Sequence, residues 1–247
     1  MKDFSPIVNP NLPTDKVRHI VASGEYTQYI NELNNCGISV LTTQICNDIL
    51  PAVRSHADMV FAYLGNARYI IEKSQKNLKK ELDNIGLFTE FDDVSLCNNY
   101  PDDIKLNSCI ICDKILTGKK NTFDLCSDKY KVIKVPQGYA KCSVCVINEN
   151  SIITDDESIY NACIAYDMDV LLIRKGSVQL NGFDYGFIGG CCGKISADTI
   201  AFCGDITTHA DYAKIKSFLS ERNIFALSLG RGKLTDIGSL LPITQQI

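Results

Sequence analysis

A histidine and an aspartate separated by one residue are the first candidates for chemistry in this sequence. His56 and Asp58 flank Ala57, and in an extended strand alternate residues point to the same face. A histidine in a pocket can act as a general acid and base, and a carboxylate beside it can bind a cation. The alternative is that Asp58 lies in a turn or caps a helix while His56 is half-buried filler. The residues leave both interpretations open.

Four further aspartates stand near the ends of expected strands and could together form a negative cavity for a cationic or polar ligand. Asp155 and Asp156 lie within one turn of an expected helix start, where carboxylates stabilise the helix. Capping is therefore the favoured role for these two. Asp205, after Gly204, and Asp236 have no helix so close, and we predict that they contact the ligand.

Two adjacent cysteines are the thiols with the strongest claim to a chemical role among the twelve in the chain. Glycines flank Cys191 and Cys192, and glycine lets a backbone approach a ligand closely. Because a thiolate is a good nucleophile, Cys192 is the candidate nucleophile, His56 its partner, and Cys191 a residue that contacts the ligand. The favoured alternative is a glycine-bearing bend in a strand with two small buried thiols.

The two Cys-x-x-Cys pairs suggest a zinc site, but their setting argues against one. Cys109 and Cys112, like Cys142 and Cys145, fall in apolar runs typical of strands. In an extended strand residues i and i+3 point to opposite faces, so neither pair could hold one ion without a tight turn. The glycine-rich segment 182–193 has no phosphate-loop pattern. We therefore expect no metal and no cofactor.

Composition and charge narrow the class of protein. The 247 residues are 45% hydrophobic and 22% charged, with a net charge of −4, so we expect a folded globular protein that does not bind nucleic acid. No apolar run approaches the ~20 residues of a membrane helix, and the N-terminal residues lack the apolar stretch of a signal peptide. We expect a cytoplasmic protein with reduced thiols.

The elements that must position these residues repeat along the chain. In the clearest unit, 139–176, strands are expected over 140–147 and 151–154, followed by a helix and a strand over 169–173. The pattern Thr154-x-x-Glu157 has the form of a capping box for that helix. The order of elements is therefore strand, strand, helix, strand.

The same order recurs in the other parts of the chain. In the unit after the clearest one, strands are expected over 187–190 and 199–202 and a helix over 209–222; the weakest unit has only a short helix near 123–125. Pairing a strand at 238–243 with the beginning of the chain would close the array and remove exposed sheet edges. The sequence thus predicts one domain over residues 1–247; the alternative is an ordinary mixed α/β domain. The approximate repeats are 1–43 (closed by 236–247), 56–93, 104–136, 139–176 and 185–230.

Five such units resemble the pentein fold, a five-bladed α/β-propeller with pseudo-five-fold symmetry. This is the fold of the guanidine-modifying enzymes, which include arginine deiminases, agmatine deiminases, dimethylarginine hydrolases and amidinotransferases. The resemblance implies an active site on the central axis. There a cysteine attacks the guanidinium carbon, a histidine acts as acid and base, and carboxylates hold the guanidinium group.

Two short stretches carry the resemblance further. The residues His-Ala-Asp-Met at 56–59 are similar to the His-x-Asp-Met of agmatine deiminases, which carries their catalytic histidine and a guanidinium-binding aspartate. Residues 243–247 resemble the tail that follows their catalytic cysteine, and in that register the nucleophile position is Pro242. Proline cannot act as a nucleophile, and no cysteine follows Cys203.

We therefore expect a pentein that binds a small polar or guanidinium-type ligand in a central pocket without the usual cysteine hydrolase chemistry. One alternative is an active hydrolase or amidinotransferase with a relocated nucleophile such as Cys192. Another is a non-enzymatic pentein that binds a protein partner, as the ribosome-binding anti-association factor does.

Overall fold

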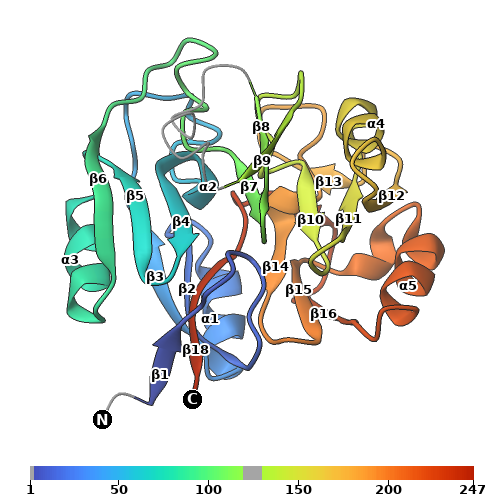
Figure 1. Ribbon diagram of the computed structural model, residues 1–247, viewed down its shortest axis with the longest axis horizontal. Coiled ribbons are helices and arrows are strands. Elements are labelled where there is room, and N and C mark those ends of the chain that lie inside the picture. The colour runs from blue at the N-terminus through green and yellow to red at the C-terminus, as the bar shows by residue number, and fades with distance from the viewer. Residues whose placement is uncertain (1–2, 119–129) are drawn as a thin grey trace.

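The computed structural model describes residues 3–118 and 130–247 and shows a mixed α/β fold (Figure 1). In the described part of the chain the strands form five sheets of three or four strands, and one short two-stranded pair. The three-stranded sheets are β4 (Phe61–Gly65), β5 (Arg68–Glu72) and β6 (Phe88–Val94); β7 (Cys109–Ile111), β8 (Lys114–Thr117) and β9 (Lys131–Lys134); β10 (Val144–Val146), β11 (Ser151–Thr154) and β12 (Asp169–Leu172); and β14 (Cys192–Lys194), β15 (Thr199–Cys203) and β16 (Phe225–Leu229).

Each three-stranded sheet combines an antiparallel pair with a parallel pair. A parallel pair needs a crossover connection, and a helix provides it between β5 and β6, between β11 and β12, and between β15 and β16. These three units therefore follow the expected order of strand, strand, helix, strand. The expected short helix near 123–125 lies outside the described residues.

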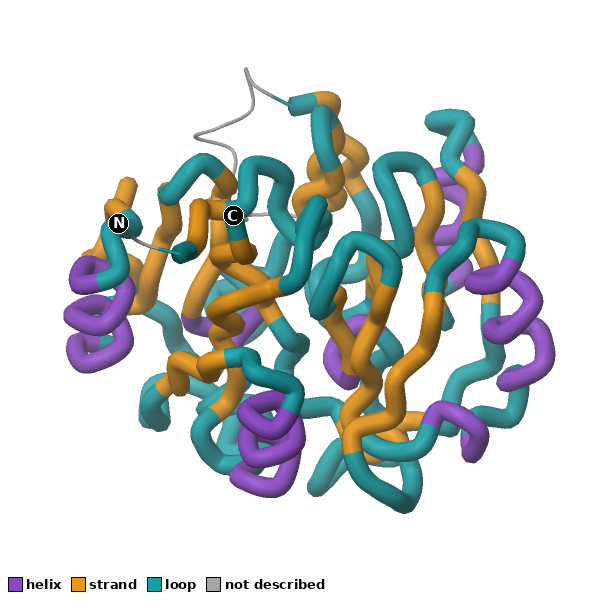
Figure 2. The backbone as a smooth tube through the Cα atoms, turned by 90° about the horizontal axis from the view of Figure 1, so that it is seen from below, coloured by secondary structure: helices purple, strands orange, loops and turns teal. Residues whose placement is uncertain are grey.

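The helices bury one apolar stripe each and lie mostly at the periphery, outside the strands (Figure 2). In α3, for example, Leu78 and Leu82 are four residues apart and both are buried, as the helical period requires. The longer helices are α1 (Thr27–Asn35), α3 (Lys76–Asn84), α4 (Glu157–Ile164) and α5 (Tyr212–Ser220), and the shorter ones are α2 (Ala57–Val60) and the 3-10 turns Gly189–Cys191 and Ile206–Thr208. No helix among the described residues is long and apolar enough to cross a bilayer.

The fifth sheet joins the first and last strands of the chain. Its strands are, in order, β1 (Phe4–Pro6), β18 (Leu241–Gln246), β2 (Val17–Ser23) and β3 (Ser39–Thr43), so that the first and last strands lie side by side (Figure 1). The remaining pair is β13 (Val178–Gln179) with β17 (Leu234–Thr235). The expected strand at 238–243 begins only at Leu241, because Gly238 and Ser239 turn the chain with φ of 80° and 69°.

Two segments differ from the strands considered for them in the sequence. Residues 57–60 form α2, so His56 and Asp58 do not share one face of a strand. Residues 189–191 form a 3-10 turn ahead of β14, where a Cβ on Gly189 would come within 2.4 Å of the Val144 carbonyl oxygen. Both segments bend because they run against neighbouring backbone at the centre of the molecule, and local periodicity does not report such contacts.

A closed circuit of hydrogen bonds connects five inner turns, each of which precedes the first strand of a sheet or, at the chain's end, β18. Backbone and amide groups link each turn to the next, at donor–acceptor distances of 2.8–3.1 Å. The bonds run from Asp58 N to Gly238 O, from Asn107 Nδ2 to Asp58 O, from Lys141 N to Asn107 Oδ1, from Gly190 N to Cys142 O, and from Ser239 N to Gly190 O. The inner ends of the five sheets are therefore tied to one another around a common centre.

Candidate functional site

Three of the residues singled out in the sequence meet at this centre. His56, Asp58 and Asp236 are each only 1% exposed, and His56 Nδ1 lies 3.7 Å from Asp236 Oδ1. His56 immediately precedes α2, Asp58 lies within it, and Asp236 follows β17. Residues 180 positions apart in the chain are thus neighbours, as the hypothesis of a central pocket requires.

Asp58 is a buried carboxyl group with one oxygen engaged and the other free. Its Oδ2 accepts hydrogen bonds from Ser239 Oγ at 2.5 Å and from Cys142 Sγ at 3.1 Å. Its Oδ1 has no hydrogen-bond partner among the described residues. Burial raises the pKa of Asp58, and the nearby His56 opposes that rise. The unused oxygen is a strong acceptor held away from water.

Lys141 supplies a positive charge beside this carboxyl group. Its Nζ donates to Ser239 Oγ at 3.1 Å, and its side chain is 94% buried. Burial opposes the charge, but Cys109 and Asp58 nearby raise the pKa of Lys141 above its usual value. The ammonium group is therefore charged and partly balances Asp58 through the Ser239 hydroxyl.

His56 is held by packing rather than by hydrogen bonds. Neither ring nitrogen has a hydrogen-bond partner in the described part of the chain, and burial lowers the pKa of His56, so the ring is neutral near pH 7. A Cβ on Gly238 would lie 2.2 Å from the Cβ of His56. Glycine at 238 is therefore what lets the imidazole lie against the turn before β18.

Asp236 is hydrogen-bonded at both oxygens. It accepts from the backbone N–H of Phe187 at 2.9 Å and from that of Gly238 at 3.0 Å. Burial nevertheless raises the pKa of Asp236 to about 6. A Cβ on Gly190 would come within 2.1 Å of Asp236 Oδ1, so the glycine-rich segment around Cys191 is shaped to accommodate this carboxyl group.

A small cavity of about 20 Å³ opens beside Asp58 and Lys141. It is large enough for about one water molecule, and Leu106, Ser108 and Pro242 are among its lining residues. Pro242 is the residue that the resemblance places at the nucleophile position. The structure thus has a small recess lined by both polar and apolar side chains, and it is not wide enough for a ligand larger than water without movement of side chains.

Cys142, Asn107 and Ser239 belong to the centre but were not expected there from the sequence. Asn107 Nδ2 lies 3.0 Å from Cys142 Sγ, and burial together with Asp58 raises the pKa of the Cys142 thiol well above its usual value. Their positions in the chain could have revealed them, because each lies just before a strand that begins at the centre. Asn107 precedes β7, Cys142 precedes β10 and Ser239 precedes β18, as Asp58 precedes β4.

The structure does not bring Cys192 into contact with His56. The Sγ of Cys192 lies 3.9 Å from the carbonyl oxygen of Gly189, and Cys191 Sγ donates to the Ile188 carbonyl at 3.2 Å. Both thiols are buried in an apolar core cluster. Their setting matches the alternative of two small buried thiols, and the described cysteines are all free.

The remaining aspartates have different roles. Asp205 caps the 3-10 turn Ile206–Thr208 by accepting from Thr207 N at 2.9 Å, a cap that sequence periodicity did not reveal. Asp156 caps α4 through Ser158 N and Ile159 N, as the capping interpretation predicts, whereas the Thr154 hydroxyl of the expected capping box donates to a carbonyl oxygen. The capping interpretation is wrong for Asp155, which is buried and is not the N-cap of α4.

Solved structures share this fold at very low sequence identity. SxtG, an amidinotransferase from Microseira wollei in the saxitoxin biosynthetic pathway, has a TM-score of 0.60 and 10% identity, with 97% of each chain covered. An inosamine-phosphate amidinotransferase from Streptomyces griseus has a TM-score of 0.58 and 10% identity, with 97% of each chain covered. DDAH from Pseudomonas aeruginosa, complexed with citrulline, has a TM-score of 0.55 and 9% identity, with 94% of this chain and 100% of that chain covered. The chain therefore shares the fold of these two amidinotransferases and of DDAH, which is the pentein fold.

Within this fold class, the sequence places the chain more narrowly. Residues 20–241 match a family of unknown function (DUF6873), and the chain belongs to that family. No curated protein sequence is significantly similar to it.

Proposed function

We propose that this protein is a five-bladed pentein that binds a small cationic ligand of the guanidinium type at its centre, without cysteine hydrolase chemistry. The observation that carries the proposal is the buried Oδ1 of Asp58, which has no hydrogen-bond partner among the described residues, in a side chain that lines a small cavity. An N–H of a guanidinium group could donate a charge-assisted hydrogen bond to this oxygen. Binding would therefore satisfy an acceptor that is otherwise costly to bury.

The size of the cavity defines how such a ligand must enter. With room for about one water molecule beside Asp58 and Lys141, a guanidinium head group fits only after a side chain moves. Lys141 is the group to move, because its ammonium already lies next to the Ser239–Asp58 hydrogen bond. In this proposal the guanidinium group of the ligand replaces the ammonium group of Lys141 as the positive charge beside Asp58 and Ser239.

The thiol nearest to the ligand site is unsuited to nucleophilic attack. A reactive cysteine has a lowered pKa and is present as thiolate, whereas burial and Asp58 raise the pKa of Cys142. Cys142 Sγ donates a hydrogen bond to Asp58, which requires the protonated thiol. This arrangement supports binding over hydrolysis.

A thermal-shift titration with agmatine and arginine tests the proposal. We expect either ligand to raise the Tm of the wild type, by an amount equivalent to about 2.7 kcal/mol at 100 times Kd. Asp58→Asn, which keeps the shape of the side chain but removes its charge, should abolish the shift. The control Asp184→Asn changes an exposed carboxylate and should leave it unchanged.

Absence of a shift in the wild type with both compounds would overturn the assignment of ligand class. An equal shift in Asp58→Asn would overturn the assignment of the site.

A second candidate function is a guanidine-modifying hydrolase with a relocated cysteine, because the structure places one thiol, that of Cys142, at the central carboxyl group. Alkylation of the folded protein, followed by mass spectrometry, separates the two functions. Binding without catalysis predicts slow labelling of Cys142 and Cys192, both of which are buried. One fast-reacting cysteine that agmatine protects would instead establish the hydrolase.

A further inference from the structure

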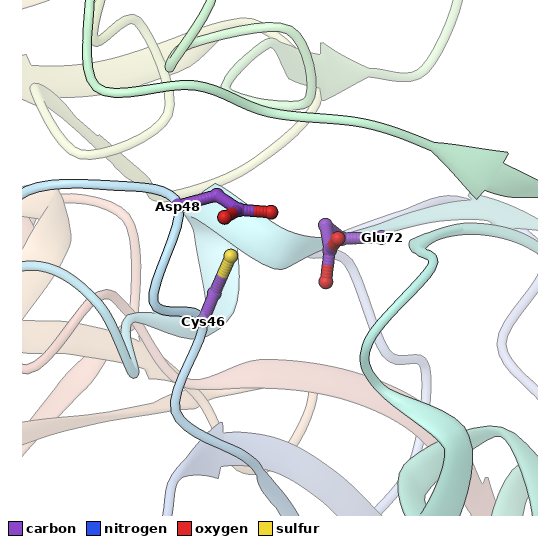
Figure 3. Close-up of side chains that lie close together, drawn as sticks. All are labelled: Cys46, Asp48 and Glu72. Carbon is purple, nitrogen blue, oxygen red and sulfur yellow. The ribbon is translucent and has the colours of Figure 1, made fainter.

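A second cluster of ligating side chains lies outside the centre, where the segment after β3 passes the end of β5. Cys46 and Asp48 come from that segment, and Glu72 is the last residue of β5. One ligand atom from each lies within 4.8 Å of the other two. Figure 3 shows the sulfur of Cys46 and the carboxylate of Asp48 directed into the space that Glu72 borders.

The burial of Glu72 is the independent sign that a ligand belongs here. Glu72 is 1% exposed, and its Oε2 accepts hydrogen bonds from the backbone N and the hydroxyl of Ser74. Its Oε1 is buried and has no hydrogen-bond partner among the described residues. A buried carboxylate oxygen without a partner is costly, and a cation held between Glu72 and its neighbours would offset that cost.

We propose that Cys46, Asp48 and Glu72 form a binding site for one Zn²⁺ ion. One thiolate and two carboxylates are ligands that zinc accepts, whereas Mg²⁺ and Ca²⁺ are bound through oxygen atoms alone. Asp48 is exposed while Cys46 and Glu72 are buried, so an ion can enter from solvent on the Asp48 side. A water molecule would complete the four ligands of the ion.

The charges around the cluster suit such an ion. Three anionic ligands exceed the charge of Zn²⁺ by one, and the Nζ of Lys73 lies 3.9 Å from Asp48 Oδ2. The site is separate from the two Cys-x-x-Cys pairs considered in the sequence, because Cys46 belongs to neither.

The position of the cluster indicates a structural role. The segment between β3 and α2 is fastened to the start of α3 by two hydrogen bonds between Gln44 and Gln75, at 2.8 and 2.9 Å. It closes on itself through Cys46 N and Arg54 O at 2.8 Å. An ion bound at Cys46 and Glu72 would fix the same segment to β5. Since that segment ends at His56, the ion would stabilise the approach to the central site.

Metal titration of the reduced, chelator-treated full chain tests the proposal, with Co²⁺ as a spectroscopic substitute for Zn²⁺. We expect one equivalent of Co²⁺ to give the absorption band of a thiolate ligand and Zn²⁺ to displace it. Cys46→Ala should remove the band. Glu72→Gln should weaken binding by more than about 100-fold, since removing even an outer-shell partner of a metal costs about 10- to 100-fold.

Two further variants keep the test decisive. Cys36→Ala removes a half-buried thiol outside the cluster and should bind Co²⁺ like the wild type. Asp48→Asn changes an exposed side chain, so it should keep the circular-dichroism spectrum of the wild type and still bind at least about tenfold more weakly. The proposal is overturned if the wild type binds no stoichiometric metal, or if Cys46→Ala and Asp48→Asn bind as tightly as Cys36→Ala, which would place the metal on other thiols.

Discussion

At the scale of single residues, Asp155 shows how burial controls a carboxyl group in this protein. Asp155 is 3% exposed, and its Oδ1 has no hydrogen-bond partner in the described part of the chain. Burial raises the pKa of Asp155 to about 7, although Lys175 nearby opposes the rise. Because the folded-state pKa lies above the unfolded one, the folded protein holds this proton more tightly than the unfolded chain does. The stability it contributes is therefore complete below about pH 4 and is lost as the pH rises towards 7.

Asp155→Asn should remove this pH dependence. Relative to the variant, the wild type should lose roughly 4 kcal/mol of unfolding free energy between about pH 4 and about pH 8. Urea denaturation of both proteins at the two pH values measures the difference. Asp184→Asn, at an exposed site, should follow the wild type, and parallel curves for wild type and Asp155→Asn would contradict the burial argument.

How well single residues could be predicted depended on how local their roles are. The capping role of Asp156 follows from its place before a helix, and the structure confirms it. Asp205 caps a 3-10 turn of three residues, which is too short to leave a periodic pattern. The grouping of His56, Asp58 and Asp236 was suggested by residue type. The contacts of Asp58 with Cys142 and Ser239 come from distant turns, which no local pattern specifies.

At the scale of elements, Asn107 is the link between two of the inner turns. Its Nδ2 donates to Asp58 O at 3.1 Å, and its Oδ1 accepts from Lys141 N at 2.9 Å and from Cys142 N at 3.3 Å. Asn107 is fully buried, so water cannot replace these bonds. The side chain substitutes for backbone pairing between neighbouring sheets.

Asn107→Ala should therefore destabilise the protein by about 2 to 4 kcal/mol, because it leaves two buried N–H groups and one carbonyl without a partner. Asn181→Ala, at an exposed position, should change stability by less than about 0.5 kcal/mol. Chemical denaturation of both variants provides the comparison. A loss at Asn107 no larger than that at Asn181 would mean that the circuit contributes little to stability.

A whole element could be predicted where the periodicity of its apolar side chains is that of the helix or strand which the chain forms. The helix expected over 209–222 is observed as Tyr212–Ser220, and the strand expected over 151–154 lies where the sequence places it. The expected strand at 187–190 was wrong, and at 56–58 the alternative of a turn or cap holds, because the chain turns at the centre in both segments. Those turns form because glycines and polar side chains meet backbone from other sheets, an interaction that overrides strand propensity.

At the scale of the whole molecule, β18 holds together the four-stranded sheet of β1, β18, β2 and β3. It lies between β1 and β2 and is antiparallel to both. Ile243 in this strand is fully buried, and the turn before it carries Ser239. The last strand therefore supplies both the middle of a sheet and part of the central cluster.

Deleting residues 241–247 should prevent stable folding, because β1 loses its partner and β2 an adjacent strand. A chain that lacks only Ile247, which is 85% exposed, should fold normally. Circular dichroism and limited proteolysis distinguish the two. Adding a synthetic peptide of residues 239–247 should restore protection, and a stable truncated chain would show that β18 is dispensable.

The sequence by itself determined the repeated order of strands and helices, the apolar faces of the helices and the residue types available for chemistry, because these depend on near neighbours in the chain. Only the tertiary structure decided which polar groups meet. It placed Asp58 beside Cys142, Lys141 and Ser239, separated Cys192 from His56, and brought Glu72 to Cys46 and Asp48. These contacts depend on how separate sheets approach one another, and burial then raises the pKa of Asp58 and of Cys142.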